Sequence, residues 1–307
     1  MSNEGDNMVT NKLHELYHIL EELVAKVLGE NARYRLIFFL RTGKRLKLSN
    51  PIDLNEKLFW LSRYWRNPLI TLCSDKCSVR EYVANKGCGD ILNDQYGVYD
   101  TADQIDFDKL PSKFVLKCNH GSRMNIIVED KEKLNIPETI KTLNKWVHFQ
   151  YGRGTEWQYK YIKPQILVEK YLESSDGKMI EYQIFCFNGK PMFFLVRNDL
   201  RKSSVDKQSL EYAVSYTIDW QRVYMRKNEE QFDFELSKPH NYEKMIEYAI
   251  RLSQDFPQVR VDYYEVDDKL VFGELTFSSS GSILSNYKKE YIKSLGKELQ
   301  LPSKYNE

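Results

Sequence analysis

The chain has 307 residues, of which 42% are hydrophobic and 13% aromatic, so it carries enough apolar surface for a sizeable core. Its 45 Lys and Arg residues nearly balance 44 Asp and Glu residues, which leaves a net charge of +1. This balance argues against a globally basic protein that binds nucleic acid, although a local basic cleft is compatible with it. The length favours about two subdomains.

No apolar run approaches the roughly 20 residues that a transmembrane helix needs. The polar N-terminus also lacks the basic and then apolar pattern of a signal peptide. We therefore predict a cytoplasmic protein without a transmembrane segment. The five cysteines are odd in number and show no repeated CxxC spacing, which argues against a disulfide framework and against a structural zinc site.

The first predicted elements are helices. Apolar residues return every three or four positions across 13–27, which predicts an amphipathic helix that packs locally, with a membrane-surface or partner-binding role as the alternative. A basic connector is expected at 40–53. A second helix is predicted from Asn55 onward, and Ser74 is expected to cap a third that runs to about Val83.

The rest of the chain is rich in strand patterns. Strands are predicted at 91–99, 114–119, 125–129, 165–172, 180–187, 192–198, 212–218, 259–266 and 270–277, with helices at 137–149 and 241–254. Asn188-Gly189 predicts a hairpin turn, and the polar stretch 201–208 predicts a mobile loop. These patterns favour an α+β fold.

The most informative segment for function is the last predicted hairpin. Alternation along the first strand places Arg260, Asp262 and Tyr264 on one face, and alternation along the second does the same for Glu274 and Thr276. Two facing carboxylates repel unless a cation lies between them, and oxygen ligands beside a polyphosphate suit Mg²⁺. The alternative is a surface hairpin in which Asp262 pairs with Arg260 or with a nearby lysine.

A second candidate is Lys117, which lies in an apolar strand just before the loop His120-Gly121-Ser122-Arg123. A lysine carried into apolar surroundings needs an anionic partner, and a phosphate held by the backbone amides of the loop would serve. The alternative is a pair with a local carboxylate. The predicted strand at 165–172 could offer an apolar slot for an adenine, although alone it is only a core strand.

Several common catalytic signatures are missing, among them the P-loop, the G-x-G-x-x-G fingerprint, the G-x-S-x-G elbow and H-E-x-x-H. The motifs that are present resemble the ATP-grasp superfamily and, within it, the TupA-like branch associated with teichuronopeptide and capsular polysaccharide synthesis. The matching stretches lie at 54–57, 75–83, 106–111, 114–122, 166–172, 185–189 and 260–281, and together they cover about 49–285.

The resemblance implies an ATP-grasp fold, in which two α+β subdomains clasp a nucleotide and an N-terminal helical extension precedes them. The expected division is an extension at 1–48, a helical and strand region at 49–112, a small lobe at 113–163 and a large lobe with the metal site at 164–307. The implied cofactors are ATP and Mg²⁺.

The resemblance also implies a role for each matching residue. Lys117 and Arg260 would be catalytic, with Lys117 contacting phosphate and Arg260 offsetting the charge of the transferring phosphoryl group. Nucleotide binding is expected for Lys117, His120, Gly121, Ser122, Glu169, Lys170, Tyr171, Leu172 and Glu181, and metal binding for Asp262, Glu274 and Thr276. Three positions depart from the pattern: Arg123 replaces a glycine, Gln183 a lysine, and Thr276 an asparagine.

The implied activity is that of an ATP-dependent ligase that forms a C–N bond through an acyl phosphate. Its expected partners are ATP, a carboxylate-bearing glycan or nucleotide-sugar such as a uronic acid of a cell-surface polysaccharide, and an amine. Peripheral association with polysaccharide assembly machinery is also expected. The alternatives are a phosphotransferase that acts on a sugar hydroxyl, and a glycosyltransferase-associated nucleotide-binding protein without turnover.

Overall fold

The computed structural model describes residues 20–149, 151–152, 154–175, 177, 179–198 and 212–305. The loop predicted at 201–208 and the first part of the helix predicted at 13–27 lie outside these residues. Residues 20–28 are helical. Across the described ranges, no helix has the length and apolar character that crossing a membrane requires.

The described chain alternates helical segments with antiparallel strands, which confirms the α+β class. The helices are α2 (Glu30–Thr42), α3 (Leu54–Tyr64), α4 (Pro68–Ser74), α5 (Val79–Asn85), α6 (Ile136–Val147), α7 (Tyr242–Ser253) and α8 (Lys289–Glu298). The strands are β1 (Gln95–Tyr99), β2 (Phe114–Cys118), β3 (Asn125–Val128), β4 (Ile166–Lys170), β5 (Ile180–Phe187), β6 (Lys190–Asn198), β7 (Ala213–Thr217), β8 (Arg222–Val223), β9 (Gln258–Val266) and β10 (Lys269–Thr276). Two short 3-10 segments, η5 (Gly154–Tyr161) and η8 (Ser279–Ser282), matter for the site.

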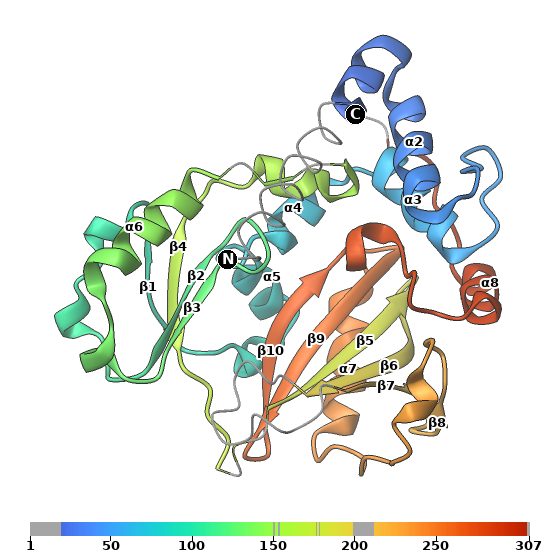
Figure 1. Ribbon diagram of the computed structural model, residues 1–307. Coiled ribbons are helices and arrows are strands. Elements are labelled where there is room, and N and C mark those ends of the chain that lie inside the picture. Colours follow the sequence, from blue (N-terminus) through green and yellow to red (C-terminus); the bar gives the residue numbers. More distant parts are fainter. Residues whose placement is uncertain are drawn as a thin grey trace, which may run out of the picture.

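The strands form two sheets. The smaller sheet has the order β1-β4-β2-β3 and the larger one β10-β9-β5-β6-β7-β8. Helices α4 and α5 lie between the two sheets (Figure 1). Strand β4 pairs within the smaller sheet, although the predicted boundary after residue 163 groups it with the later strands. The division into lobes at the expected positions stays a prediction.

The two faces of the six-stranded sheet have different surroundings. Helix α7 packs against one face, because Met245, Ala249 and Leu252 recur at helical spacing and are fully buried there. On the opposite face, the apolar side chains of Phe185 and Phe193 pack in a second core with residues of α2, α3 and α8. The rest of that opposite face is polar, and it carries the candidate site.

Two helices differ from the predictions in ways that matter for function. Helix α2 occupies much of a stretch for which no element was predicted, and it ends where the connector was expected. The expectation that Ser74 caps a helix is wrong, because Ser74 is the last residue of α4 and α5 begins only at Val79. Helix α4 starts at Asn67-Pro68, where the asparagine side chain accepts a hydrogen bond from Leu69 N and proline fills the first turn.

Candidate active site

The polar face of the six-stranded sheet brings together residues from three neighbouring strands. Asp262 on β9 lies opposite Glu274 on β10, and Arg260 lies opposite Thr276. On the other side of β9, Gln183 of β5 lies opposite Asp262. The predicted acids therefore share one face, with Arg260 beside them.

This arrangement depends on a β-bulge in the hairpin. Up to Phe272 the two strands pair regularly, and a regular continuation would place Glu274 opposite Val261, on the side that packs against α7. Instead the register shifts, Gly273 becomes the extra residue, and Glu274 lies opposite Asp262. A Cβ atom at Gly273 would lie only 2.9 Å from the carbonyl oxygen of Asp262, so the bulge requires glycine.

Arg260 and Asp262 form a buried, bidentate ion pair. Nε of Arg260 donates to Oδ1 at 2.7 Å and Nη2 donates to Oδ2 at 2.5 Å, and Asp262 is fully buried. Burial raises the pKa of Asp262 above the ordinary carboxyl range, while Arg260 opposes that rise. The pairing of Asp262 with Arg260, which the sequence offered as the alternative, is thus observed. The pair is buried, however, and does not lie on a surface hairpin.

Glu274 is the more accessible of the two acids, since its side chain is 45% exposed. Oγ1 of Thr276 donates to its Oε1 at 2.8 Å, and Nη2 of Arg260 lies 3.5 Å from the same oxygen. Burial acts to raise the pKa of Glu274, but the ammonium of Lys76 and the guanidinium of Arg260 outweigh it and hold the pKa below its usual value. Glu274 is therefore a carboxylate open to an incoming cation.

Strand β5 adds two polar side chains to the same face. Gln183 is almost fully buried, and its Oε1 accepts no hydrogen bond from the described residues. Glu181, predicted to bind the nucleotide, lies opposite Tyr264, and its charge acts on both Asp262 and Arg260. The structure thus groups Glu181 with the acids of the large sheet.

Lys117 lies on the smaller sheet and pairs with a second predicted residue. Its Nζ lies 2.6 Å from Oε2 of Glu169 on the adjacent strand β4, and the two side chains are 29% and 12% exposed. The alternative of a pair with a nearby carboxylate is the contact observed. The partial exposure leaves the ammonium able to reach a ligand between the sheets.

Three residues of the predicted phosphate loop, His120, Gly121 and Ser122, have polar contacts with their surroundings. His120 is buried, and its Nε2 lies 3.1 Å from the carbonyl oxygen of Phe149. Burial lowers the pKa of His120, which favours the neutral ring. Oγ of Ser122 lies 2.8 Å from the hydroxyl of Tyr151. Arg123 has a φ of 61°, a left-handed conformation that glycine adopts more readily than arginine.

The residues after Glu169 have contacts elsewhere. Lys170 is exposed and pairs with Asp94 at 3.1 Å. The hydroxyl of Tyr171 donates to Glu129 at 3.2 Å, and Leu172 is half-buried. A nucleotide-binding role for these three residues stays a prediction.

The sequence interpretation missed Lys76, which follows α4 directly. Its Nζ donates to the carbonyl oxygen of Gly121 at 2.6 Å, and its charge acts on Glu274, Lys117 and Glu169. Burial lowers the pKa of Lys76, and these two glutamates oppose the effect. Lys76 thus connects the acids of one sheet with the Lys117–Glu169 pair of the other.

Two buried polar residues hold Lys76 in place. The carboxylate of Asp75 accepts hydrogen bonds from Cys77 N, the Ser78 hydroxyl and the Asn119 amide, at 2.8 to 2.9 Å. Asn119 also bonds to Lys163 O and Gln165 N. The only local signal for this arrangement is the Asp75-Lys76 pair between two helices, and it does not show what the lysine reaches.

We expect Lys76→Met to weaken nucleotide binding by about tenfold or more, because a charge-assisted contact contributes roughly 1.5–3 kcal/mol. Methionine retains the length of the side chain and removes its charge. Calorimetric titration with an adenine nucleotide and Mg²⁺ checks this result. The exposed Lys44→Met on the N-terminal connector is the control, and equal affinities for the two variants would contradict the assignment.

The oxygen-rich face between the sheets fits a hard divalent cation. Its candidate donors share one face: the accessible Glu274, the amide oxygen of Gln183, which accepts no hydrogen bond from the described residues, and the buried Asp262. Both oxygens of Asp262 accept from Arg260 in this structure, so a cation there would compete with that ion pair. Among the described residues, no three His, Cys, Asp or Glu side chains gather in a metal-binding group. The protein would therefore supply two carboxylates, and phosphate oxygens and water would complete the shell.

The two antiparallel sheets, with Lys117 on one and an acid pair on the other, agree with the arrangement that the ATP-grasp resemblance implies. The chain belongs to the TupA-like ATPgrasp family, whose model matches residues 56–300. The predicted resemblance is thus confirmed. No curated protein matches the chain closely enough to count as a relative.

Solved structures of ligases resemble the chain at low identity. The L-amino acid ligase from Bacillus licheniformis is 13% identical with a TM-score of 0.46, over 82% of this chain and 56% of that one. D-Alanine-D-alanine ligase from Helicobacter pylori is 14% identical with a TM-score of 0.46, over 82% and 70%. D-Alanine–D-alanine ligase from Bacillus anthracis, in complex with ATP, is 16% identical with a TM-score of 0.41, over 67% and 55%, so the chain spans about half of its length.

Proposed function

We propose that the protein is an ATP-dependent carboxylate–amine ligase that works through an acyl phosphate. The observation that carries this proposal is the opposition of Lys76 and Lys117 to the Asp262–Glu274 acid pair across the space between the sheets. Cations on one side and metal-binding oxygens on the other suit a polyphosphate with its divalent ion. Membership of the ATP-grasp family supports the same reading.

In this proposal Lys117 turns from Glu169 to a phosphate oxygen, and Lys76 provides a second positive charge. Asp262 and Glu274 would hold Mg²⁺, and the bound ion would supply positive charge that offsets the charge of the phosphate oxygens. Arg260 lies beside both acids and would neutralise charge that develops on the transferring phosphoryl group. Thr276 would orient Glu274 through its hydrogen bond.

The chemistry would proceed in two displacements. A carboxylate oxygen of the substrate bonds to the γ-phosphorus while the bond to the β–γ bridging oxygen breaks, which gives an acyl phosphate and ADP. The amine then bonds to the acyl carbon, phosphate leaves with the electron pair of the broken C–O bond, and the amine releases a proton to solvent. The site must exclude water during this interval, since hydrolysis would destroy the acyl phosphate.

We propose a uronic acid of a cell-surface polysaccharide, either within a glycan or as a nucleotide-sugar, as the carboxylate substrate, and an amino acid or related amine as its partner. The remaining nucleotide contacts would come from His120, Gly121, Ser122 and Glu181. We further propose a cytoplasmic location with peripheral association with polysaccharide assembly machinery. This assignment rests on the resemblance to the TupA-like branch.

Trapping with hydroxylamine tests the reaction class. The protein is incubated with ATP, Mg²⁺, hydroxylamine and a panel of carboxylates that includes glucuronate and galacturonate. We expect a hydroxamate and ADP in equal amounts. We expect EDTA to abolish both, because without a divalent cation the two acids would repel the phosphate oxygens.

The other outcomes of the trapping experiment identify the alternatives. ADP together with a stable phosphoester and no hydroxamate would identify a phosphotransferase that acts on a hydroxyl. Nucleotide binding without ADP formation across the whole panel would identify a binding protein without turnover.

A further inference from the structure

The segment η8, which follows the metal-binding strand β10, has an unusual backbone. Three consecutive residues, Ser280, Gly281 and Ser282, have φ angles of 50°, 60° and 65°. Residues with a Cβ atom rarely adopt this left-handed region, and runs of it are rarer still. The turn therefore needs contacts from elsewhere to hold it.

A large part of that support comes from Arg41, in the last turn of α2. Its Nη2 donates to the carbonyl oxygen of Ser280 at 2.7 Å, and its Nη1 donates to that of Gly281 at 2.8 Å. Oγ1 of Thr155 donates to the same Gly281 oxygen at 3.0 Å. One planar guanidinium thus holds two successive carbonyl groups of the left-handed turn.

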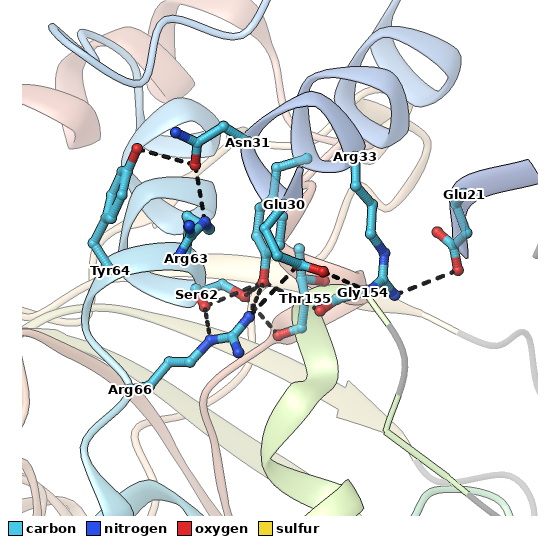
Figure 2. A network of polar contacts seen from close by, with 11 residues as sticks. Glu21, Glu30, Asn31, Arg33, Ser62, Arg63, Tyr64, Arg66, Gly154 and Thr155 are labelled. Carbon is cyan, nitrogen blue, oxygen red and sulfur yellow. Dashed lines mark hydrogen bonds and ion pairs between the residues drawn. The ribbon is translucent and has the colours of Figure 1, made fainter. Parts of the chain in front are cut away.

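Helix α2 is itself fixed by a network of polar contacts (Figure 2). The buried hydroxyl of Tyr34 on α2 contacts Ser62 of α3 and donates to the carbonyl oxygen of Gly154. The hydroxyls of Ser62 and Ser278 both donate to the carbonyl oxygen of Thr155, at 2.9 and 3.1 Å. These contacts form a continuous connection from α2 through α3 and η5 to the start of the turn.

The turn also contacts a candidate catalytic residue, Arg260. Nη1 of Arg260 lies 3.3 Å from Oγ of Ser279, and the turn follows Thr276 by only a few residues. A change in the turn would therefore reach the guanidinium that pairs with Asp262. Helix α2 precedes the segment 56–300 that the family model matches, so Arg41 lies outside it.

We propose that Arg41 is a positioning residue, through which the N-terminal helix α2 holds the turn 278–282 and, through Ser279, the guanidinium of Arg260. The inference rests on the proposed ligase function. Arg41 contacts the turn and not the candidate nucleotide or metal residues. We therefore expect its loss to lower turnover, through the contact between Ser279 and Arg260, and to change nucleotide binding little.

The experiment compares full-length Arg41→Ala and Arg41→Lys with the control Arg35→Ala, which removes an exposed arginine from the same helix. The first readout is hydrogen exchange of the backbone amides at 277–284, which needs no substrate. We expect faster exchange there in both Arg41 variants and unchanged exchange in β9. Exchange equal to that of the wild type would overturn the proposal.

The second readout is steady-state kinetics with the carboxylate identified by trapping. We expect the kcat of Arg41→Ala to fall by about tenfold or more, because small displacements of a positioned catalytic group are costly. The nucleotide KM should stay within about twofold. Added guanidinium should restore much of the loss in Arg41→Ala, since the site is exposed. Faster exchange with an unchanged kcat would overturn the positioning role.

The two readouts also distinguish a failure of this proposal from a failure of the proposed ligase function. If the wild type forms no product with any carboxylate, the proposed function fails, and the predicted effect of Arg41 on turnover fails with it. The exchange measurement then still decides whether Arg41 holds the turn. If the wild type is active, a failure of the Arg41 variants to differ from Arg35→Ala rejects the positioning role alone.

Discussion

Replacing Asp262 by asparagine is expected to lower ADP formation by about a thousandfold, because the loss of about 4 kcal/mol of metal-assisted charge stabilisation corresponds to that factor. Asparagine keeps the shape of the side chain and removes the charge that would hold the cation. ADP release in the presence of Mg²⁺ is the measurement. Asp268→Asn, an exposed acid in the turn of the same hairpin, should behave like the wild type.

The same substitution should also destabilise the fold. Arg260, whose side chain is only 14% exposed, would lose its charged partner, and breaking a buried ion pair costs about 3–5 kcal/mol. The double variant Arg260→Gln/Asp262→Asn removes both charges and should unfold at a higher denaturant concentration than Asp262→Asn, yet remain inactive. A folded Asp262→Asn variant with the turnover of the wild type would reject the metal assignment.

The second large effect is expected at Lys117. Lys117→Met should raise the KM for ATP by about tenfold to a hundredfold, since a charge-assisted contact to a phosphate contributes roughly 1.5–3 kcal/mol. Initial rates of ADP formation at several ATP concentrations measure it. Stability should change little, because the Lys117–Glu169 pair is partly exposed and Lys76 lies nearby.

Lys113 offers a matched control for this experiment. It lies just before β2 and pairs with Glu173 at 2.7 Å, with both side chains well exposed. Lys113→Met therefore removes an exposed ion pair at the start of the same strand, away from the acid pair. Equal KM values for the Lys113 and Lys117 variants would show that the predicted phosphate contact is absent.

Local patterns in the sequence were sufficient to predict most strands and helix α7. In β5 and β9, apolar and aromatic residues line the face toward α7, and the alternation that buries them also assigns Arg260 and Asp262 to the opposite face. The charge that Lys117 carries into an apolar strand was visible as well. Its partner Glu169 comes from β4, and that pairing is set by the order of strands in the sheet and not by nearby residues.

Other features depended on contacts that are distant in the sequence. Lys76 bonds to Gly121, and Arg41 bonds to η8. Both hydrogen bonds join residues that are far apart in the sequence, so no local spacing predicts them. Helix α4 was missed because Asn67-Pro68 was not recognised as a helix start. The predicted meeting of Asp262 and Glu274 assumed simple alternation, whereas the hairpin needs the shift at Gly273 to bring them together.

Gly273 carries no reactive group, yet it decides on which side of the sheet the accessible acid lies. A relative that lost this one residue from the hairpin could retain every charged residue named above and still present its glutamate to the hydrophobic interior. An inventory of acids and bases would count such a protein as intact. When members of this family are compared, the spacing between the two acids therefore carries as much information about activity as their identity does.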